Sequence, residues 1–240
     1  MGWIRLDKLL AQSGERSRTE AARLVRAGCV TVDGQPARDP ARKLDADTAA
    51  VLLNGQPVLD EPYRYLMFHK PAGVLTAARD RKAKTVMDLL PEALRRRDVL
   101  PVGRLDKDTT GLLLLTNDGE LAHRLLAPQR HVWKEYRVVA DGPLGREDVE
   151  AFETGLELSD FTAKPAKLTV LESTEDRSVS VVCLSEGKFH QVKRMFAARG
   201  REVLTLHRQA FGSLVLDVEE GAYRPLTLQE IAALRAAAQG

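Results

Sequence analysis

Apolar residues recur in the first quarter of the chain with two different periods, one helical and one alternating. Residues 6–10 and 21–25 carry leucine, valine and alanine at helical spacing, which predicts two short helices. Residues 30–32 and 51–53 are short strand-like runs, each followed by Asp-Gly or Asn-Gly, which is the pattern of strands joined by tight turns. We therefore predict a small helix-helix-hairpin domain over residues 1–59.

The rest of the chain carries further strand-like runs, separated by polar turns and by helical patterns. These runs are residues 65–68, 112–115, 134–139, 179–184 and 204–206. A turn is predicted at residues 69–73, where Pro and Gly follow the first run, and the polar residues 60–62 are predicted to be a linker. We expect an α+β protein, in which residues 63–240 form a larger, mixed and mainly antiparallel sheet flanked by helices.

The most informative stretch covers residues 103–128. Residues 112–115 form an unbroken leucine run closed by Thr-Asn-Asp-Gly, which predicts a strand buried on both faces. Two carboxylates, Asp106 and Asp108, lie in the polar loop just before this strand, where a rigid element can hold functional groups in place. After the strand, Asn117 with a Glu three residues later predicts the start of a helix. On spacing alone, Asp106 has the ordinary role of a turn residue that bonds its own backbone.

A second polar segment follows the strand at residues 179–184 and is predicted to become a helix after Gly187. At helical spacing, its inward stripe consists of Phe189, Val192 and Phe196. Lys193 falls beside this stripe, whereas Arg194 falls almost opposite and is expected to face outward. A half-buried lysine needs a counter-ion, and Asp106 is the obvious candidate. The alternative is that Lys193 extends its ammonium to solvent.

The formal net charge is only +2, but the charge is distributed unevenly. Residues 1–43 and 63–128 each carry an excess of Lys and Arg, and the span between them, residues 44–62, carries four acidic residues and no base. Two basic surfaces separated by an acidic span are expected of a protein in which two surfaces each contact phosphate groups. Ordinary solvated surfaces remain the alternative for either block alone.

The basic residues of the first domain are Arg5, Lys8, Arg16, Arg18, Arg23 and Arg26. No aromatic residues are interleaved with them, so such a surface is suited to the backbone and shape of folded RNA rather than to its bases.

Composition also argues against several classes of protein. No apolar run approaches the ~20 residues that cross a bilayer, and the N-terminus lacks the apolar stretch of a signal peptide, so we expect a cytoplasmic protein. Cys29 and Cys183 are far apart and form no CxxC pattern, and the five histidines show no ligand spacing. We therefore expect no metal and no other cofactor, which disfavours a metal-dependent hydrolase.

The run Gly-Arg-Leu-Asp at residues 103–106, with Asp-Thr-Thr-Gly-Leu at residues 108–112, resembles the signature loop of the pseudouridine synthases, and in particular of the RsuA-type small-subunit ribosomal enzymes. Arg-Leu-Asp-Lys-Leu-Leu at residues 5–10, followed downstream by Ser-Arg-Thr-Glu-Ala, resembles the RNA-binding domain named after ribosomal protein S-four. The resemblance covers the chain from about residue 5 to residue 234 and implies the pseudouridine synthase fold for the larger domain.

The resemblance also implies roles for individual residues. Asp106 is the expected catalytic residue, Tyr136 is expected to pack on the target uracil, and Lys193 is expected to pair with Asp106. The residues expected to bind RNA are Arg104, Lys70, Arg5, Lys8, Arg18, Arg23 and Arg26.

The implied activity is isomerisation of uridine to pseudouridine in small-subunit (16S) ribosomal RNA, within an assembly intermediate, by a monomer that needs no cofactor and no membrane. Two alternatives stay open at this point. One is a pseudouridine synthase that acts on large-subunit ribosomal RNA. The other is a non-catalytic RNA-binding ribosome-assembly factor, although such a protein has no reason to keep Asp106, Tyr136 and Lys193 in three separate elements.

Overall fold

The computed structural model describes residues 2–13, 16–46, 48–58, 63–95 and 99–239. The chain divides by its internal contacts into two units, Met1–Arg64 with Pro91–Asp98, and Tyr65–Leu90 with Val99–Gly240. The predicted linker, residues 60–62, lies outside the described residues. No helix in the described ranges combines the length and the apolar composition needed to cross a membrane.

The first unit contains the predicted helices and hairpin. Its elements are β1 (Trp3–Arg5), α1 (Leu6–Ser13), α2 (Arg18–Arg26), β2 (Val30–Val32), β3 (Gln35–Ala37), β4 (Lys43–Asp45), β5 (Val51–Leu53), β6 (Gln56–Pro57) and α3 (Glu92–Arg95). Strands β3-β2-β5-β6 form one sheet, and β1 pairs with β4, a pair that the sequence analysis missed. Leu6, Leu9 and Leu10 of α1 pack into the core of this unit.

Local chemistry explains where these elements begin and turn. The Ser17 hydroxyl caps α2 by accepting a hydrogen bond from the Glu20 amide, and the Glu20 carboxylate in turn accepts from the Ser17 amide, so both free N–H groups are satisfied. Asp33 and the glycine after it both have positive φ angles, of 53° and 76°. This is the backbone of a type I′ turn, whose twist suits a two-residue hairpin.

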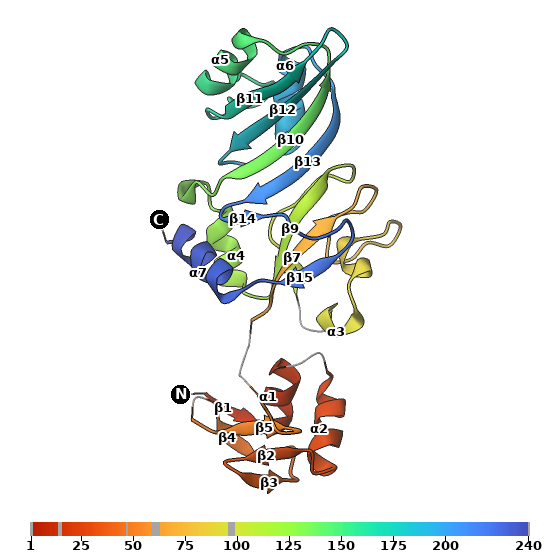
Figure 1. Cartoon of the computed structure of the whole chain (residues 1–240), viewed down its shortest axis with the longest axis vertical. Coiled ribbons are helices and arrows are strands. Elements are labelled where there is room, and N and C mark those ends of the chain that lie inside the picture. Colours follow the sequence, from red (N-terminus) through yellow and green to blue (C-terminus); the bar gives the residue numbers. More distant parts are fainter. Residues whose placement is uncertain (1, 14–15, 47, 59–62, 96–98, 240) are drawn as a thin grey trace. The chain divides into compact units, whose positions relative to one another are not determined.

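The second unit is built on one large sheet (Figure 1). Its strands are β7 (Tyr65–Lys70), β8 (Leu100–Pro101), β9 (Thr110–Thr116), β10 (Lys134–Asp141), β11 (Lys167–Ser173), β12 (Arg177–Leu184), β13 (Val203–Phe211), β14 (Leu214–Val215) and β15 (Tyr223–Pro225). Its α-helices are α4 (Gly119–Leu126), α5 (Arg146–Thr154), α6 (Gln191–Ala198) and α7 (Leu228–Ala237), and the 3₁₀ helices are η1 (Val86–Leu89) and η2 (Pro128–Arg130).

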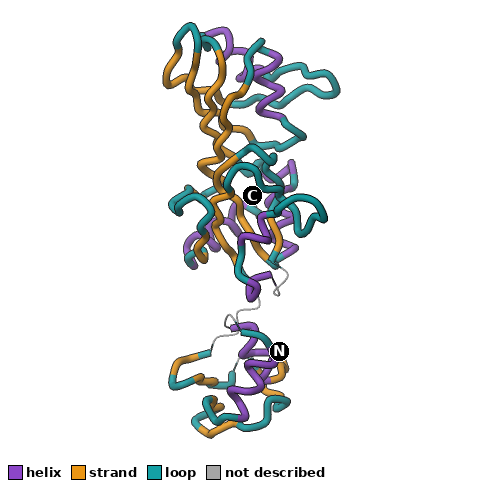
Figure 2. Tube along the Cα trace, turned by 90° about the vertical axis from the view of Figure 1, so that its right-hand side faces the viewer, coloured by secondary structure: helices purple, strands orange, loops and turns teal. Residues whose placement is uncertain are grey.

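The main strand order is β11-β12-β10-β13-β9-β7-β15. The pairing of β9 with β13 is parallel and the other recorded pairings are antiparallel, so the predicted mixed, mainly antiparallel sheet is confirmed. Seen from the side, β10 to β13 form one layer, and the helices beside them lie on one face (Figure 2). Helix α5 packs on β11, and α6 packs on β13.

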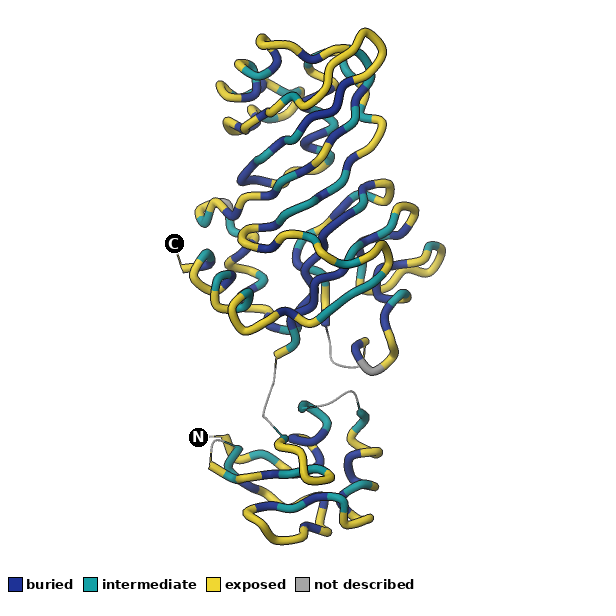
Figure 3. Tube along the Cα trace, viewed as in Figure 1, coloured by how far each residue is buried: buried dark blue, intermediate teal, exposed yellow. Residues whose placement is uncertain are grey.

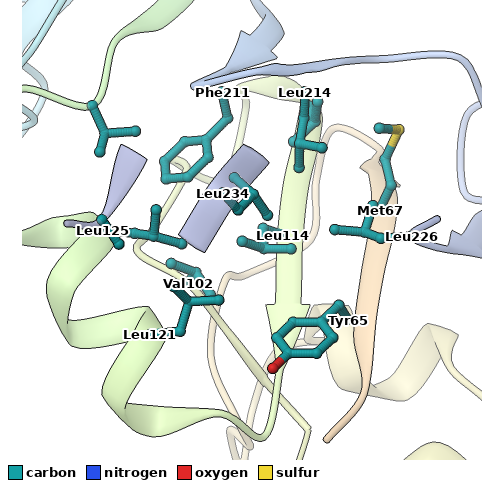
Figure 4. Packing of buried hydrophobic residues seen from close by; sticks show 13 residues of the cluster. Tyr65, Met67, Val102, Leu114, Leu121, Leu125, Phe211, Leu214, Leu226 and Leu234 are labelled. Carbon is teal, nitrogen blue, oxygen red and sulfur yellow. The ribbon is translucent and has the colours of Figure 1, made fainter. Parts of the chain in front are cut away.

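Strand β9 is the buried centre of this unit, as the leucine run predicts. The side chains of residues 112–115 are completely buried, and β7 beside it is buried over most of its length (Figure 3). Leu112 and Leu114 belong to a cluster that also receives Tyr65 from β7, Phe211 from β13 and Leu234 from α7 (Figure 4). Each buried leucine contributes about 2 kcal/mol of hydrophobic free energy, so β9 is a firm base for the loop that precedes it.

Two predicted boundaries differ from the structure. Helix α4 is capped by Asp118 rather than Asn117, because the Asp118 carboxylate accepts hydrogen bonds both from the Leu121 amide, at 3.0 Å, and from the Tyr65 hydroxyl, at 2.6 Å. The buried Tyr65 hydroxyl thus fixes the carboxylate of Asp118, and not the side chain of Asn117, at the start of the helix. The turn predicted at residues 69–73 begins later, since β7 continues to Lys70.

Candidate active site

The loop at residues 103–109 enters β9 and is held from behind by a buried lysine. The Lys70 side chain is 0% exposed, and its ammonium donates to the backbone carbonyls of Thr109 at 2.7 Å, Pro71 at 3.0 Å and Lys107 at 3.2 Å. Burial lowers the pKa of Lys70 to about 8. The three hydrogen bonds of the ammonium go to backbone carbonyls, two of them in this loop, and the role of Lys70 in RNA binding stays a prediction.

A glycine closes the loop against the neighbouring strand. Gly111 has a φ of +109°, and a Cβ at this position would lie 2.2 Å from the carbonyl oxygen of Arg208, its partner in the parallel pairing of β9 with β13. Only glycine allows the two backbones to approach this closely at this φ. The position of the loop before β9 therefore depends on the pairing of β9 with β13 as well as on the loop residues themselves.

Asp106 lies in this loop, 25% exposed, opposite the side chains of Lys193 and His190, which come from a distant part of the sequence. Lys193 Nζ is 3.9 Å from Asp106 Oδ2, and His190 Nε2 is 3.5 Å from Asp106 Oδ1. The expected proximity of Asp106 and Lys193 is present. The hydrogen bonds of Lys193, however, go to Asp108, at 2.6 and 2.7 Å.

Asp108 is thus a residue whose role the sequence analysis missed, although it was noted as a loop carboxylate. The hydrogen bond from Lys193 holds the pKa of Asp108 below its usual value. Lys193 is therefore shared between two carboxylates two residues apart, one hydrogen-bonded to it and one at ion-pair distance.

Tyr136 joins Asp106 at one cavity. The tyrosine lies in β10, its side chain is buried, and it lines a cavity of about 60 Å³ together with Asp106 and Arg104. The other residues of this wall include Lys188, His190, Gln191 and Thr109. The loop before β9, strand β10 and the turn before α6 therefore present Asp106, Tyr136 and Lys188 to the same space.

A larger cavity of about 350 Å³ shares Arg104 and Tyr136 with the first. Its wall includes two buried cations, Lys134 and Arg208. The Lys134 ammonium donates to the Val132 carbonyl at 2.9 Å, and burial together with the charge of Arg208 lowers the pKa of Lys134 to about 8.

The turn before α6 differs from its prediction. Phe189 was expected on the inward face of a helix, but α6 begins only at Gln191, and the Phe189 side chain is 72% exposed. The helix does not start earlier because His190 has a left-handed backbone, with a φ of 51°, and the Gln191 side-chain oxygen accepts from the Lys188 amide at 2.9 Å. Val192 and Phe196 are buried as predicted. Arg194 points to the loop at residue 160, where its guanidinium pairs with Asp160.

The remaining predicted RNA-binding residues fall into two groups, exposed cations and cations that are paired with a carboxylate. Arg104 is exposed in the active-site loop. In the first unit, Arg5 and Arg18 both donate to the buried carboxylate of Asp7, at 2.8 and 3.1 Å. Lys8, Arg23 and Arg26 are exposed. Asp7 was not identified from the sequence, where its only signal is its position two residues after Arg5.

The chain is similar to known proteins over both units. A family model described as RNA pseudouridylate synthase matches residues 64–198, and an S4 domain model matches residues 4–48. The uncharacterized RNA pseudouridine synthase YtzG of Bacillus subtilis is 46% identical over 231 residues, covering 95% of this chain and 97% of the relative. Ribosomal small subunit pseudouridine synthase A of Escherichia coli K12 is 41% identical over 237 residues, covering 96% of this chain and all of the relative. A crystal structure of a pseudouridylate synthase superposes with a TM-score of 0.67 at 35% identity, covering 96% of this chain and 99% of that one.

Proposed function

Because the chain belongs to the RNA pseudouridylate synthase family, we propose that it converts a specific uridine of small-subunit (16S) ribosomal RNA to pseudouridine, with Asp106 as the catalytic residue. The observation that carries the proposal is that Asp106 and Tyr136, from two separate elements, line one small cavity, while Lys193 of a third element lies 3.9 Å from Asp106. The substrate follows from the Escherichia coli relative, which is named for the small ribosomal subunit.

The reaction breaks the bond between ribose C1′ and uracil N1 and joins C1′ to uracil C5. C5 then loses its proton and N1 gains one, so the product is an isomer of the substrate. A carboxylate can begin this sequence either as a nucleophile or as a base. Lys193 Nζ lies 3.9 Å from one oxygen of Asp106, where its positive charge stabilises an anionic carboxylate, and the His190 ring lies near the other oxygen. The flat and mostly buried ring of Tyr136 provides a surface against which the uracil stacks while it turns.

The target base must leave its stack before it can reach Asp106, at a cost of a few kcal/mol. Arg104 is exposed two residues before Asp106 and lines both cavities, so its guanidinium is placed to occupy the vacated position or to hold a phosphate. Residues 63–240 supply the chemistry in this proposal. Residues 1–59 bind the ribosomal RNA through exposed cations such as Lys8, Arg23 and Arg26.

The proposal is tested in a strain that lacks the gene. Carbodiimide mapping of both ribosomal RNAs should show the loss of one pseudouridine in 16S RNA, its restoration by the wild-type chain, and no restoration by Asp106→Asn. Loss of a site in the large-subunit RNA would instead support the alternative substrate. An unchanged pseudouridine map, or restoration by Asp106→Asn, would refute the proposal.

A further inference from the structure

Two aromatic rings are stacked at the edge of the catalytic cavity. The centroids of Phe189 and His190 lie 3.8 Å apart with an angle of 17° between the ring planes. Phe189 is 72% exposed, so the face of its ring that is turned away from His190 is open to solvent. A single exposed apolar side chain is ordinary in a folded protein, and its significance depends on what surrounds it.

The backbone beneath the two rings is held in one conformation. Gln191 is buried, its amide nitrogen donates to Glu186 Oε1 at 2.6 Å, and its oxygen accepts from the Lys188 amide. Glu186 is also buried and accepts from the backbone amide of Lys164 at 2.8 Å. These bonds present Phe189 on a rigid turn, which lowers the entropy that a ligand must overcome on binding.

His190 has a φ of 51°, in the left-handed region that costs a non-glycine residue free energy. This backbone conformation turns its ring toward Asp106, with Nε2 at 3.5 Å from Oδ1, while the other ring stacks on it from outside. His190 also lines the 60 Å³ cavity. The ring of Phe189 therefore continues the wall of the catalytic cavity outward.

Lys188, the residue before Phe189, and Arg194 of α6 both lie against a third ring, that of Phe161. Lys188 Nζ lies 3.7 Å from the ring centroid of Phe161, and the Arg194 guanidinium lies 4.9 Å from it. Lys188 lines the same cavity as Asp106. Aromatic rings interleaved with Lys and Arg are typical of surfaces that bind single-stranded nucleic acid, where rings stack on bases and cations follow the phosphates.

We propose that Phe189, backed by His190, is a stacking platform for an unpaired nucleobase next to the target uridine in the RNA. The proposal rests on the proposed function, because it takes RNA as the occupant of the site. A nucleobase fits the open ring face in shape and chemistry, and Lys188, next to Phe189 in the chain and in the wall of the catalytic cavity, supplies a cation for a phosphate beside it. An aromatic or aliphatic side chain of a partner protein would not need the cations.

The test uses the full chain carrying Asp106→Asn, so that only binding is read. The probes are two short single-stranded RNAs with one uridine and with 2-aminopurine on its 5′ or its 3′ side. Stacking of the probe base on Phe189 should quench the fluorescence of one of the two RNAs. Phe189→Leu should abolish this quenching and weaken binding by roughly 5- to 100-fold, whereas Phe189→Tyr should retain both. Leu228→Ala, at another exposed apolar residue, is the matched control and should bind like the parent.

Salt dependence separates stacking from charge. Phe189→Leu should leave the slope of log K against log salt unchanged, whereas Lys188→Gln should reduce it by about 0.7. Equal quenching and equal affinity in Phe189→Leu, or failure of the parent chain to quench either probe, would overturn the proposal. Failure of the isomerase proposal would appear separately, as pseudouridine formed by Asp106→Asn, because the fluorescence measurement involves no chemistry.

Discussion

Lys193 of α6 and Asp108 of the loop before β9 form an ion pair across 85 residues of sequence, with Nζ 2.6 Å from Oδ2. The same ammonium lies 3.9 Å from Asp106. The geometry indicates that Asp108 holds Lys193 in position and that the positive charge of Lys193 stabilises the carboxylate of Asp106.

Removing the two partners of this pair should therefore have unequal effects. Lys193→Met should lower the single-turnover rate of pseudouridine formation by about 100-fold or more, because positive charge next to the reacting carboxylate is lost. Asp108→Asn should lower it by less than about 10-fold, because Asp108 is largely exposed and Lys193 stays near Asp106 without it. A larger loss for Asp108→Asn than for Lys193→Met would reverse the assigned roles.

Gly111→Ala should disturb both stability and activity. Its Cβ would meet the Arg208 backbone at 2.2 Å with a φ of +109°, so we expect the free energy of unfolding to fall by about 2–4 kcal/mol. Gly200→Ala is the control for strain alone, since Gly200 has a φ of +71° with open space around it, and should cost about 1 kcal/mol. Urea unfolding of both variants measures the difference. Equal losses would show that the close approach of β9 and β13 is unimportant.

The two buried lysines predict how stability changes with pH. Burial lowers the pKa of both Lys70 and Lys134 from 10.5 to about 8. Between pH 8 and pH 10 the unfolded chain therefore holds more protons than the folded chain, and the free energy of unfolding should rise with pH. The rise is at most about 1.4 kcal/mol per pH unit for each lysine. Below pH 8 both lysines are protonated in both states and contribute no slope.

Urea unfolding between pH 7 and pH 10 tests this, followed by the fluorescence of Trp133 in a Trp3→Phe background, which reports the larger unit. Lys134→Met should show a smaller rise than the parent. The range ends at pH 10 because burial raises the pKa of Tyr65 to about 12, which adds the opposite slope above that point. Identical pH dependence of the free energy of unfolding in the parent and in Lys134→Met would contradict the lowered pKa of Lys134.

The arginines of the first unit should also separate into two groups. Arg23 and Arg26 are exposed without an ion pair in the described part of the chain, so Arg23→Gln with Arg26→Gln should weaken RNA binding and reduce its salt slope by about 0.7 per residue. Arg146→Gln, at an exposed arginine of α5, is the control and should change neither quantity.

Asp7→Asn should act on the stability of the first unit, through the two arginines that this carboxylate holds. Hydrogen bonds, first from Arg5, hold the pKa of Asp7 below its usual value, so the carboxylate anchors both Arg5 and Arg18. Its loss should lower the stability of the first unit, which circular dichroism on heating would detect. A variant with full stability and unchanged RNA binding would show that this anchoring is without consequence.

The sequence could predict those features that depend on neighbours along the chain. The leucine run of β9, the Asp-Gly turn at residue 33 and the cap at Ser17 all follow from local chemistry, and each is present. Resemblance supplied Asp106, Tyr136 and Lys193, which are remote in sequence and which periodicity alone could not have brought together.

The sequence could not predict what distant partners decide. Lys70 carries a charge and sits in a turn motif, yet its ammonium is held by two carbonyls of a loop more than thirty residues away. Phe189 fits a helical stripe, yet the left-handed backbone of His190 places the start of α6 after it, and the ring is exposed. Asp108 rather than Asp106 receives the hydrogen bond of Lys193, at 2.6 Å against 3.9 Å, and this depends on loop geometry that sequence spacing does not contain.

The most direct test of the account is tritium release from RNA labelled at C5 of uridine, since joining C1′ to C5 expels the hydrogen at that carbon. The wild-type chain should release the label in step with pseudouridine formation in 16S RNA. Asp106→Asn should bind the same RNA with an unchanged Kd and release no label above background. Release at the wild-type rate by Asp106→Asn would contradict the central claim that this carboxylate carries the chemistry.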